Sequence, residues 1–339
     1  ARAGGLGVGF YYSDATNSYC RVSGGVVKPG AVEPGRQIAV TQEQYDNIVL
    51  SHLRELWGNY GPLDELWFDG GYYPKLKEPL QALITKLQPN ATVLGGYGLA
   101  PNSLRWVGTE SGLAPYPSWS RVDCTWNEPP KCKSIQEAGE GNPDGAFWCP
   151  AETDFTLQNG DQWFYNSRAG VHPPAELRHM YEQSAGSNTG LIIDIAPYPN
   201  GSVPAEQVAA AAALGKFRRG CYGGTPVASG SGSGSTTITI KPASGVTATM
   251  DRVQIREDLS QGQIVRSFTL VALLANGTTS LLCPTRGGTS IGNKYICVLQ
   301  SPLEINSLSL TITAAKGGTP KITQFAAFSC ASLAAEIDA

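Results

Sequence analysis

The chain has 339 residues, a formal net charge of −3 at neutral pH and only 16% charged residues, which gives no sign of a nucleic-acid surface or a basic membrane-binding patch. Its length exceeds what one compact core usually needs, so two domains are expected. No stretch approaches the ~20 consecutive apolar residues of a membrane-spanning helix. Without an initiator Met or a signal-like start, the chain is expected to be a mature, processed or truncated form.

The first apolar run, residues 6–12, predicts a buried strand that ends in polar aromatic side chains. A Gly- and Pro-rich segment follows over residues 14–40 and is expected to be a long loop that shapes a binding site. Thr41 and Gln44 then have the spacing of a capping box at the start of an amphipathic helix. His52 shares the apolar stripe of this helix, so it is expected to be a core or half-buried histidine.

The stretch DELWFDGG, residues 64–71, predicts a buried parallel strand that ends in the carboxylate of Asp69. An acid at the C-terminal tip of a barrel strand is where (β/α)₈ enzymes hold their catalytic groups. A lone Asp-Gly is more often the start of a turn. The aromatic Trp67, two residues before the acid, is unusual in a turn and makes Asp69 a candidate catalytic group.

Further strands are predicted near residues 92–97, 146–150 and 190–196, with helical patterns between them, and a loop over residues 105–112 carries Glu110. Alternating strands and helices imply the parallel sheet or barrel of an α/β protein. With the two strands before them, these make five, whereas a closed barrel needs eight.

Near residue 223 the composition changes. Residues 229–235 alternate Ser with Gly, which predicts a flexible linker or loop. The short alternating runs beyond it predict an antiparallel β-sandwich of roughly a hundred residues. The expected organisation is a partial (β/α)₈-type barrel over residues 1–222, a Gly/Ser-rich linker over 223–236 and the sandwich over 237–331.

Eight cysteines favour an oxidising compartment. Cys124 with Cys132, and Cys283 with Cys297, bracket short segments and are candidate local disulfides; buried free thiols are the alternative. Only three His and no Cys-x-x-Cys argue against a zinc site.

Three N-glycosylation sequons begin at Asn90, Asn200 and Asn276. Beside the cysteines, they favour a glycoprotein that is secreted or lumenal in the secretory pathway.

Several motifs in this order resemble the α-L-fucosidases, family 29 of the glycoside hydrolases, in the branch nearer plant and fungal enzymes. They are GVGFYYS, YGPLDELWFDGG, LRWVGTESG, FWCPAETD, WFYNS, SNTGLIIDIAPYPNGSVP and REDLSQGQIVRSFTL. The resemblance implies a retaining exo-α-L-fucosidase that hydrolyses terminal α-L-fucose from glycans by double displacement, without metal or other cofactor. In that mechanism Asp69 is the nucleophile.

Two residues are candidates for the acid/base. Glu110 lies in the segment that resembles the family's acid/base segment, although Thr109 stands where the family tends to have an asparagine-like residue. Glu152 is expected to follow a strand and is the other candidate; Glu110 is favoured, and Glu152 is then a substrate-binding residue. For each, a solvated loop acid is the alternative.

Three aromatic residues are expected to bind substrate, since sugars stack on aromatic faces. They are Trp67, Tyr12 and Trp106. A place in the barrel core is an equal alternative for Tyr12.

The chain departs from the family at its start. The family's barrel opens with about three further β/α units, including a strand that ends in paired histidines, before the strand at residues 6–12. A separate N-terminal chain or segment that completes the barrel is therefore the expected partner. The alternative function is a non-catalytic glycan-binding or structural protein on a fucosidase scaffold. A β-sandwich adhesin with an α/β companion fits the composition but leaves ELWFDGG unexplained.

Overall fold

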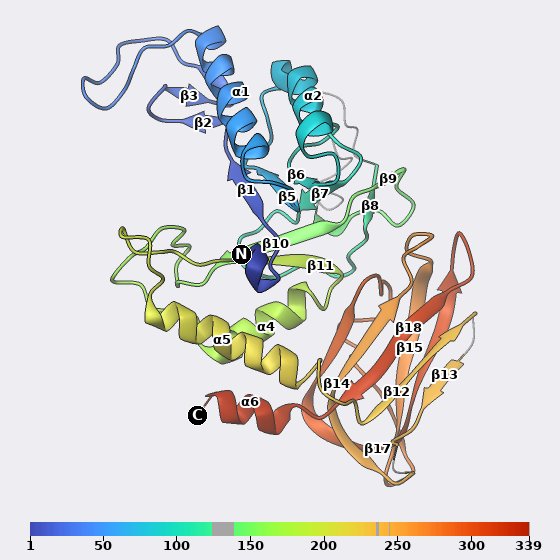
Figure 1. Ribbon diagram of the computed structural model, residues 1–339. Helices are drawn as coiled ribbons and strands as arrows, with labels where there is room; N and C mark the ends of the chain where they lie inside the picture. Colours follow the sequence, from blue (N-terminus) through green and yellow to red (C-terminus); the bar gives the residue numbers. More distant parts are fainter. Residues whose placement is uncertain (124–138, 235–236, 244, 339) are drawn as a thin grey trace. The chain divides into compact units, whose positions relative to one another are not determined.

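The computed structural model describes residues 1–123, 139–234, 237–243 and 245–338 (Figure 1). The described residues divide into two compact units. The first consists of residues 1–106, 123 and 147–150, and the second consists of residues 107–122, 139–146, 151–234, 237–243 and 245–338. In the part of the chain described, no helix is both long and apolar enough to cross a membrane.

Four parallel strands form the centre of the first unit, in the order β1-β5-β6-β7. They are β1 (Gly9–Tyr12), β5 (Glu65–Phe68), β6 (Thr92–Leu94) and β7 (Ser103–Trp106). Helices α1 (Gln42–Gly58) and α2 (Lys77–Leu87) cover one face of this sheet (Figure 1). The short elements are η1 (Arg2–Gly4), β2 (Thr16–Asn17), β3 (Val22–Ser23), β4 (Val26–Val27), η2 (Pro74–Leu76) and β9 (Phe147–Trp148).

Helix α1 begins as predicted. The Thr41 hydroxyl accepts a hydrogen bond from the Gln44 N–H at 3.2 Å, and the Gln44 side chain accepts one from the Thr41 N–H at 2.8 Å. Four side chains at a spacing of four residues are buried on the sheet: Tyr45, Val49, Leu53 and Trp57. His52 is exposed, where we expected a core or half-buried histidine. One residue corresponds to about 100° of helix rotation, which turns His52 away from the row that includes Leu53.

The second unit contains a parallel pair of strands, β10 (Ala151–Thr156) and β11 (Thr189–Asp194). Helices α4 (Pro174–Ser184) and α5 (Ala205–Gly220) bury apolar side chains with one face of this pair. The remaining elements outside the sandwich are β8 (Arg121–Val122) and α6 (Ala331–Asp338).

The six parallel strands have the order β1-β5-β6-β7-β10-β11, a curled half barrel. The predicted fold class, part of a (β/α)₈-type barrel followed by an antiparallel β-sandwich, is confirmed. Two details were wrong. The loop expected over residues 105–112 begins inside a strand, because residues 103–106 form β7. Within the strand expected at residues 146–150, residues 147–148 form β9, which pairs with β8 in a separate sheet, and the strand of the parallel sheet is β10 at residues 151–156.

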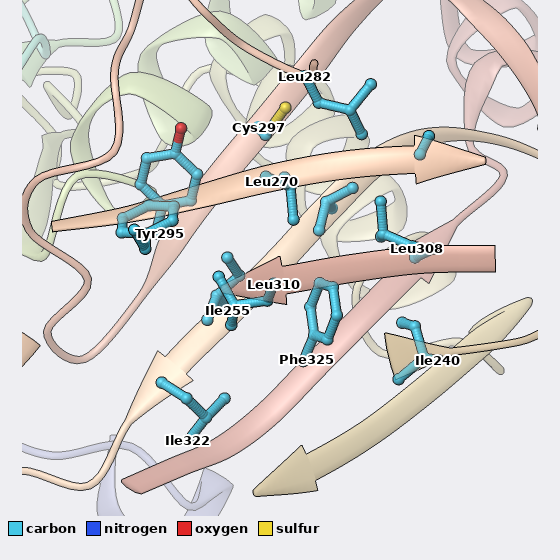
Figure 2. Close-up of a cluster of buried hydrophobic side chains, with 14 of the residues drawn as sticks. Ile240, Ile255, Leu270, Leu282, Tyr295, Cys297, Leu308, Leu310, Ile322 and Phe325 are labelled. Atoms are coloured by element: carbon cyan, nitrogen blue, oxygen red, sulfur yellow. The ribbon is translucent and has the colours of Figure 1, made fainter. Parts of the chain in front are cut away.

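Seven antiparallel strands form the sandwich, in the order β12-β18-β14-β17-β15-β16 with β13 paired to β17. They are β12 (Ala228–Ser233), β13 (Thr237–Ile240), β14 (Ala248–Glu257), β15 (Val265–Leu274), β16 (Thr279–Leu281), β17 (Tyr295–Ala315) and β18 (Lys321–Phe328). Figure 2 shows their inward-facing side chains, including Leu270, Leu310 and Phe325, gathered in one apolar core.

Part of the range expected to be a linker is strand β12. A Cβ atom on Gly230 or Gly232 would lie 2.8 Å from the side chain of Ile240 or Ile238, respectively. Glycine at these two positions therefore allows close packing against the isoleucines of β13. The linker prediction was based on composition alone and does not consider such packing.

One of the two predicted disulfides is confirmed. Cys283 and Cys297 are joined, with an S–S distance of 2.02 Å, whereas Cys124 and Cys132 lie outside the described residues. A second bond, Cys221–Cys330, was not predicted because its partners are 109 residues apart in sequence. The buried Cys20 and Cys149 are free thiols.

Removing the Cys221–Cys330 bond with the double change Cys221→Ala and Cys330→Ala is expected to lower the free energy of unfolding by about 4–5 kcal/mol, because the bond closes a loop of 109 residues. The matched removal of Cys283–Cys297, which closes a loop of 14 residues, should cost about 3 kcal/mol. Chemical denaturation of both variants without reductant measures the difference. A greater loss from the shorter loop would contradict the expectation.

Candidate active site

Asp69 directly follows the last residue of β5, at the C-terminal end of the strand. Its backbone N–H donates a hydrogen bond to the Tyr12 carbonyl at 3.1 Å, which extends the pairing of β1 with β5 by one residue. Its side chain is exposed. The acid is therefore held by strand backbone while its carboxylate is free to meet a ligand.

Tyr11 completes a small cluster around this carboxylate. Its hydroxyl donates a hydrogen bond to Asp69 Oδ2. Its ring stacks on Trp67, with centroids 5.5 Å apart and planes inclined by 21°. Desolvation, and after it the hydrogen bond to Asp69, raises the pKa of Tyr11 above its usual value. The Tyr11 hydroxyl therefore stays protonated and acts as a hydrogen-bond donor to Oδ2 of Asp69.

Strand register explains why Tyr11, and not Tyr12, belongs to this cluster. Tyr11 lies opposite Trp67 in the ladder, so the two side chains share a face. Tyr12 points to the other face, where its hydroxyl is 3.1 Å from His52 Nδ1. The role of Tyr12 in substrate binding stays a prediction. The period of two, counted from Trp67, was the signal in the sequence that could have identified Tyr11.

Trp106 is the last residue of β7 and is 36% exposed. Its backbone N–H is hydrogen-bonded to the hydroxyl of Tyr97, which fixes the main chain at this strand end. Part of the indole is thus available at the same end of the sheet as Asp69, because the strands of this unit are parallel.

In the second unit, Glu110 lies on a short loop that β10 holds at both ends. The Val107 N–H donates to the Glu152 carbonyl at 3.1 Å, and the Gly112 N–H donates to the Asp154 carbonyl at 2.9 Å. The Glu110 side chain is exposed, and its Oε2 accepts a hydrogen bond from Trp163 Nε1 at 3.2 Å. A carboxylate at the middle of a pinned loop has a fixed main chain and an accessible oxygen.

Glu152 occupies a different level of the same strand. It is the second residue of β10 and is only 8% exposed. Its side chain lies across β11, with Oε1 3.1 Å from the place that a Cβ on Gly190 would take. Four residues of strand, about 13 Å, separate it from the C-terminal end of β10 at Thr156.

Asp194, which the sequence reasoning missed, ends β11 opposite Thr156. It alternates with Leu191 and Ile193, which pack with the helices, and so lies on the other face of the strand. Its Oδ2 is buried without a hydrogen-bond partner among the described residues, and desolvation raises the pKa of this carboxyl group to about 6. The signal in the sequence was an acid ending an apolar strand, as for Asp69.

A buried carboxyl group anchors the loops beside Asp69. Asp14 is 0% exposed, and its Oδ2 accepts a hydrogen bond from the Tyr73 N–H at 2.9 Å. Its backbone carbonyl accepts one from the Tyr45 hydroxyl, also at 2.9 Å. Asp14 thus ties the segment after β1 to the segment that follows Asp69. Among the described residues, no group of three or more His, Cys, Asp or Glu side chains is arranged to hold a metal ion.

Comparison with known proteins gives one family. The sequence profile of the family described as alpha-L-fucosidase matches residues 1–220. Alpha-L-fucosidase 1 of Arabidopsis thaliana is 24% identical over 310 residues, which cover 80% of this chain and 60% of that protein. A relative from Oryza sativa subsp. japonica is 29% identical over 223 residues, which cover 61% of this chain and 37% of that protein. The chain thus spans less than two thirds of each of these relatives.

Solved structures share the fold. A glycoside hydrolase 29 family member from an unknown rumen bacterium has a TM-score of 0.78 at 24% identity, over 97% of this chain and 58% of that one. A Ruminococcus gnavus fucosidase of the same family, in complex with fucose, also has a TM-score of 0.78, at 19% identity over 98% of this chain and 74% of that one.

Asp14→Asn is expected to flatten the pH dependence of stability. Burial raises the pKa of Asp14 from 3.8 to about 6. The hydrogen bond from the Tyr73 N–H acts to lower this pKa, and the nearby Asp46 acts to raise it. The folded state thus binds this proton more tightly than the unfolded state, and the stabilisation is lost as the pH rises from 4 to 6. The loss is about 3 kcal/mol. Tyr12 and Tyr45 also face this group, and both are close to Cys20.

Urea denaturation at several pH values between 4 and 7 tests this expectation. The control is Glu43→Gln, a change of an exposed acid on α1 that should leave the slope intact. If Asp14→Asn keeps the slope of the unmodified protein between pH 4 and 6, the buried carboxyl group is not its cause.

Gly112→Ala is expected to destabilise the fold by about 2–4 kcal/mol. Gly112 has φ +69°, and a Cβ there would lie 2.8 Å from the ring of Phe155 and 3.1 Å from Met180. Gly108→Ala is the matched control, because φ is +93° but nothing lies within 4 Å of the added Cβ. Thermal unfolding should show the smaller loss for Gly108→Ala; equal losses would mean that the contact with Phe155 is irrelevant.

Proposed function

This chain belongs to the α-L-fucosidase family, and we propose that it carries the catalytic carboxyl groups of a retaining exo-α-L-fucosidase, with Asp69 as nucleophile and Glu110 as acid/base. The observation that carries the proposal is Asp69 at the C-terminal end of β5, with Tyr11 donating to its carboxylate. Such an enzyme hydrolyses terminal α-L-fucose from glycans, and double displacement needs two carboxyl groups about 5–5.5 Å apart.

Asp69 has the surroundings that a nucleophile needs. The hydrogen bond from Tyr11 holds Oδ2 in place, so the remaining oxygen is available to attack the anomeric carbon. The stacked rings of Tyr11 and Trp67 form an aromatic wall beside it. Such a wall suits the apolar edge of L-fucose with its C5 methyl group. Trp67 and Tyr11 are therefore our candidates for fucose contacts. Trp106 is a third candidate, at the C-terminal end of β7, which is two strands away from β5 in the sheet.

Two observations favour Glu110 over Glu152 as the acid/base. Glu110 is exposed on a loop after β7, whereas Glu152 is buried about 13 Å below the C-terminal end of its strand. An acid/base must reach the leaving oxygen and then a water molecule, which requires access. The hydrogen bond from Trp163 orients Glu110. Glu152 is kept as a substrate-binding candidate.

The proposal includes a partner segment. In the described sheet, β1 and β11 stand at the two ends of the strand order, and apolar side chains of β11 are only partly buried. Edges of this kind recruit further strands. A segment with additional β/α units, on the same polypeptide or a separate chain, would pair with these edges and supply the rest of the fucose pocket. No cofactor takes part in the proposed mechanism.

We also propose secretion or residence in the lumen of the secretory pathway. The sequon residues Asn90, Asn200 and Asn276 are all exposed, as glycosylation requires. Two disulfides add to this argument.

Asp69→Ala in the complete protein tests the nucleophile. Turnover of an aryl α-L-fucoside should fall on the order of 10⁴-fold or more. Azide should restore activity and give a β-fucosyl azide, because it attacks from the face that the carboxylate has vacated. If the unmodified complete protein binds fucosylated glycans but never hydrolyses them, the non-catalytic scaffold is the better description.

Glu110→Ala tests the acid/base. Fucosides with leaving groups of high pKa should react about 10²–10⁴-fold more slowly, whereas activated aryl fucosides should be affected much less in the first step, since they do not need the proton. Glu152→Gln is the matched comparison. If Glu152→Gln shows the dependence on the leaving group and Glu110→Ala does not, the acid/base is Glu152.

A further inference from the structure

Residues 159–170, here called the aromatic loop, connect β10 to the segment before α4. The loop carries three consecutive aromatic residues, Trp163, Phe164 and Tyr165. Its two ends meet, because the Asn159 N–H donates to the Gly170 carbonyl at 2.9 Å. It is therefore a closed surface loop of the kind that often carries function.

Polar side chains, and not the aromatic rings, set the shape of the aromatic loop. Gln158, 2% exposed, fills its interior: Nε2 donates to the Asn166 carbonyl at 2.9 Å, and Oε1 accepts from the Asn166 N–H at 3.1 Å. The Asn166 amide then donates to Gln162 Oε1 at 2.8 Å. The loop thus has a folded framework of its own, which leaves its three rings available for other contacts.

The three rings have different surroundings. Trp163 donates its indole N–H to Glu110 Oε2 at 3.2 Å. Tyr165 packs edge-to-face on Tyr198, with centroids 4.5 Å apart. Phe164, between them in sequence, is 86% exposed. A single exposed apolar side chain needs no explanation, but this one is next to the residue that holds the proposed acid/base.

The loop after β11, which carries Tyr198, is also fixed. Gln207 of α5 is fully buried and binds both backbone groups of Ala196: Oε1 accepts from the N–H at 2.9 Å, and Nε2 donates to the carbonyl at 3.0 Å. Tyr198 closes its own turn, accepting from the Gly201 N–H at 2.8 Å. Two independently braced loops therefore bring Tyr165 and Tyr198 together.

We infer that Phe164, with Tyr165 and Tyr198, binds the sugar that leaves with the glycosidic oxygen. This inference rests on the proposed function of Glu110. A general acid must approach the leaving oxygen to about 2.6–3.2 Å, so the leaving sugar starts next to Glu110. Trp163 joins that carboxylate to the aromatic loop. Aromatic faces are the surfaces on which neutral sugars stack, so the expected ligand is the neutral oligosaccharide to which fucose was attached.

Phe164→Ala in the complete protein tests the inference through a ratio of rates. The kcat/KM for a fucosylated trisaccharide is compared with that for an aryl α-L-fucoside, whose leaving group is no sugar. We expect Phe164→Ala to lower this ratio about tenfold, mainly by raising KM for the trisaccharide, because one stacking contact with the leaving sugar is lost. Inhibition by the defucosylated disaccharide should weaken in parallel. Phe164→Trp, which keeps an aromatic face, should retain the ratio.

Leu281→Ala is the matched control, since it removes a large apolar side chain, 56% exposed, from β16 in the same unit. It should leave the ratio unchanged. Tyr198→Ala should lower the ratio like Phe164→Ala. If both Phe164→Ala and Tyr198→Ala keep the ratio of the unmodified protein, the aromatic loop does not bind the leaving sugar. If the unmodified protein hydrolyses neither substrate, it is the proposed function that fails.

Discussion

The parallel pairing of β1 with β5 is the constraint on which the first unit depends. Because Tyr11 lies opposite Trp67, their rings stack on one face and the Tyr11 hydroxyl reaches Asp69. On the other face the same alternation sends Leu66 and Phe68 into the core beneath α1 and α2. A slip of one residue would exchange the two faces, so the register that buries the core also orients the carboxylate.

Elements with a regular apolar pattern could be predicted from the sequence. The capping box, the four buried positions of α1 and the strand that ends at Asp69 follow from local rules, and the structure has them. Strands β7 and β10 resisted prediction because many of their buried positions are polar, among them Arg105, Asp154 and Thr156. A barrel interior tolerates such side chains, so its strands lack the apolar run that identifies a strand.

The parts of the candidate site where a strand ends in an acid could be predicted from the sequence. The parts that depend on which face of a strand a side chain occupies, or on contacts between residues far apart in sequence, were harder to predict. Asp69 was identified as an acid at a strand end, and the same rule applied to residues 190–194 would have identified Asp194. Tyr11 was not among the candidates from the sequence, although counting in twos from Trp67 places it on the same face as Trp67. The bond between Trp163 and Glu110 joins residues 53 apart in sequence, and no local pattern announces it.

The Cys221–Cys330 bond has a topological consequence. All seven strands of the sandwich lie between its two cysteines, and α6, which follows Cys330, returns to the helices through Arg178–Asp338 and Lys216–Glu336 ion pairs. The sandwich is therefore a covalent ring closed at the end of α5. A protease that cuts any one of its surface loops opens the ring without detaching a fragment, and the two pieces separate on a gel only after reduction.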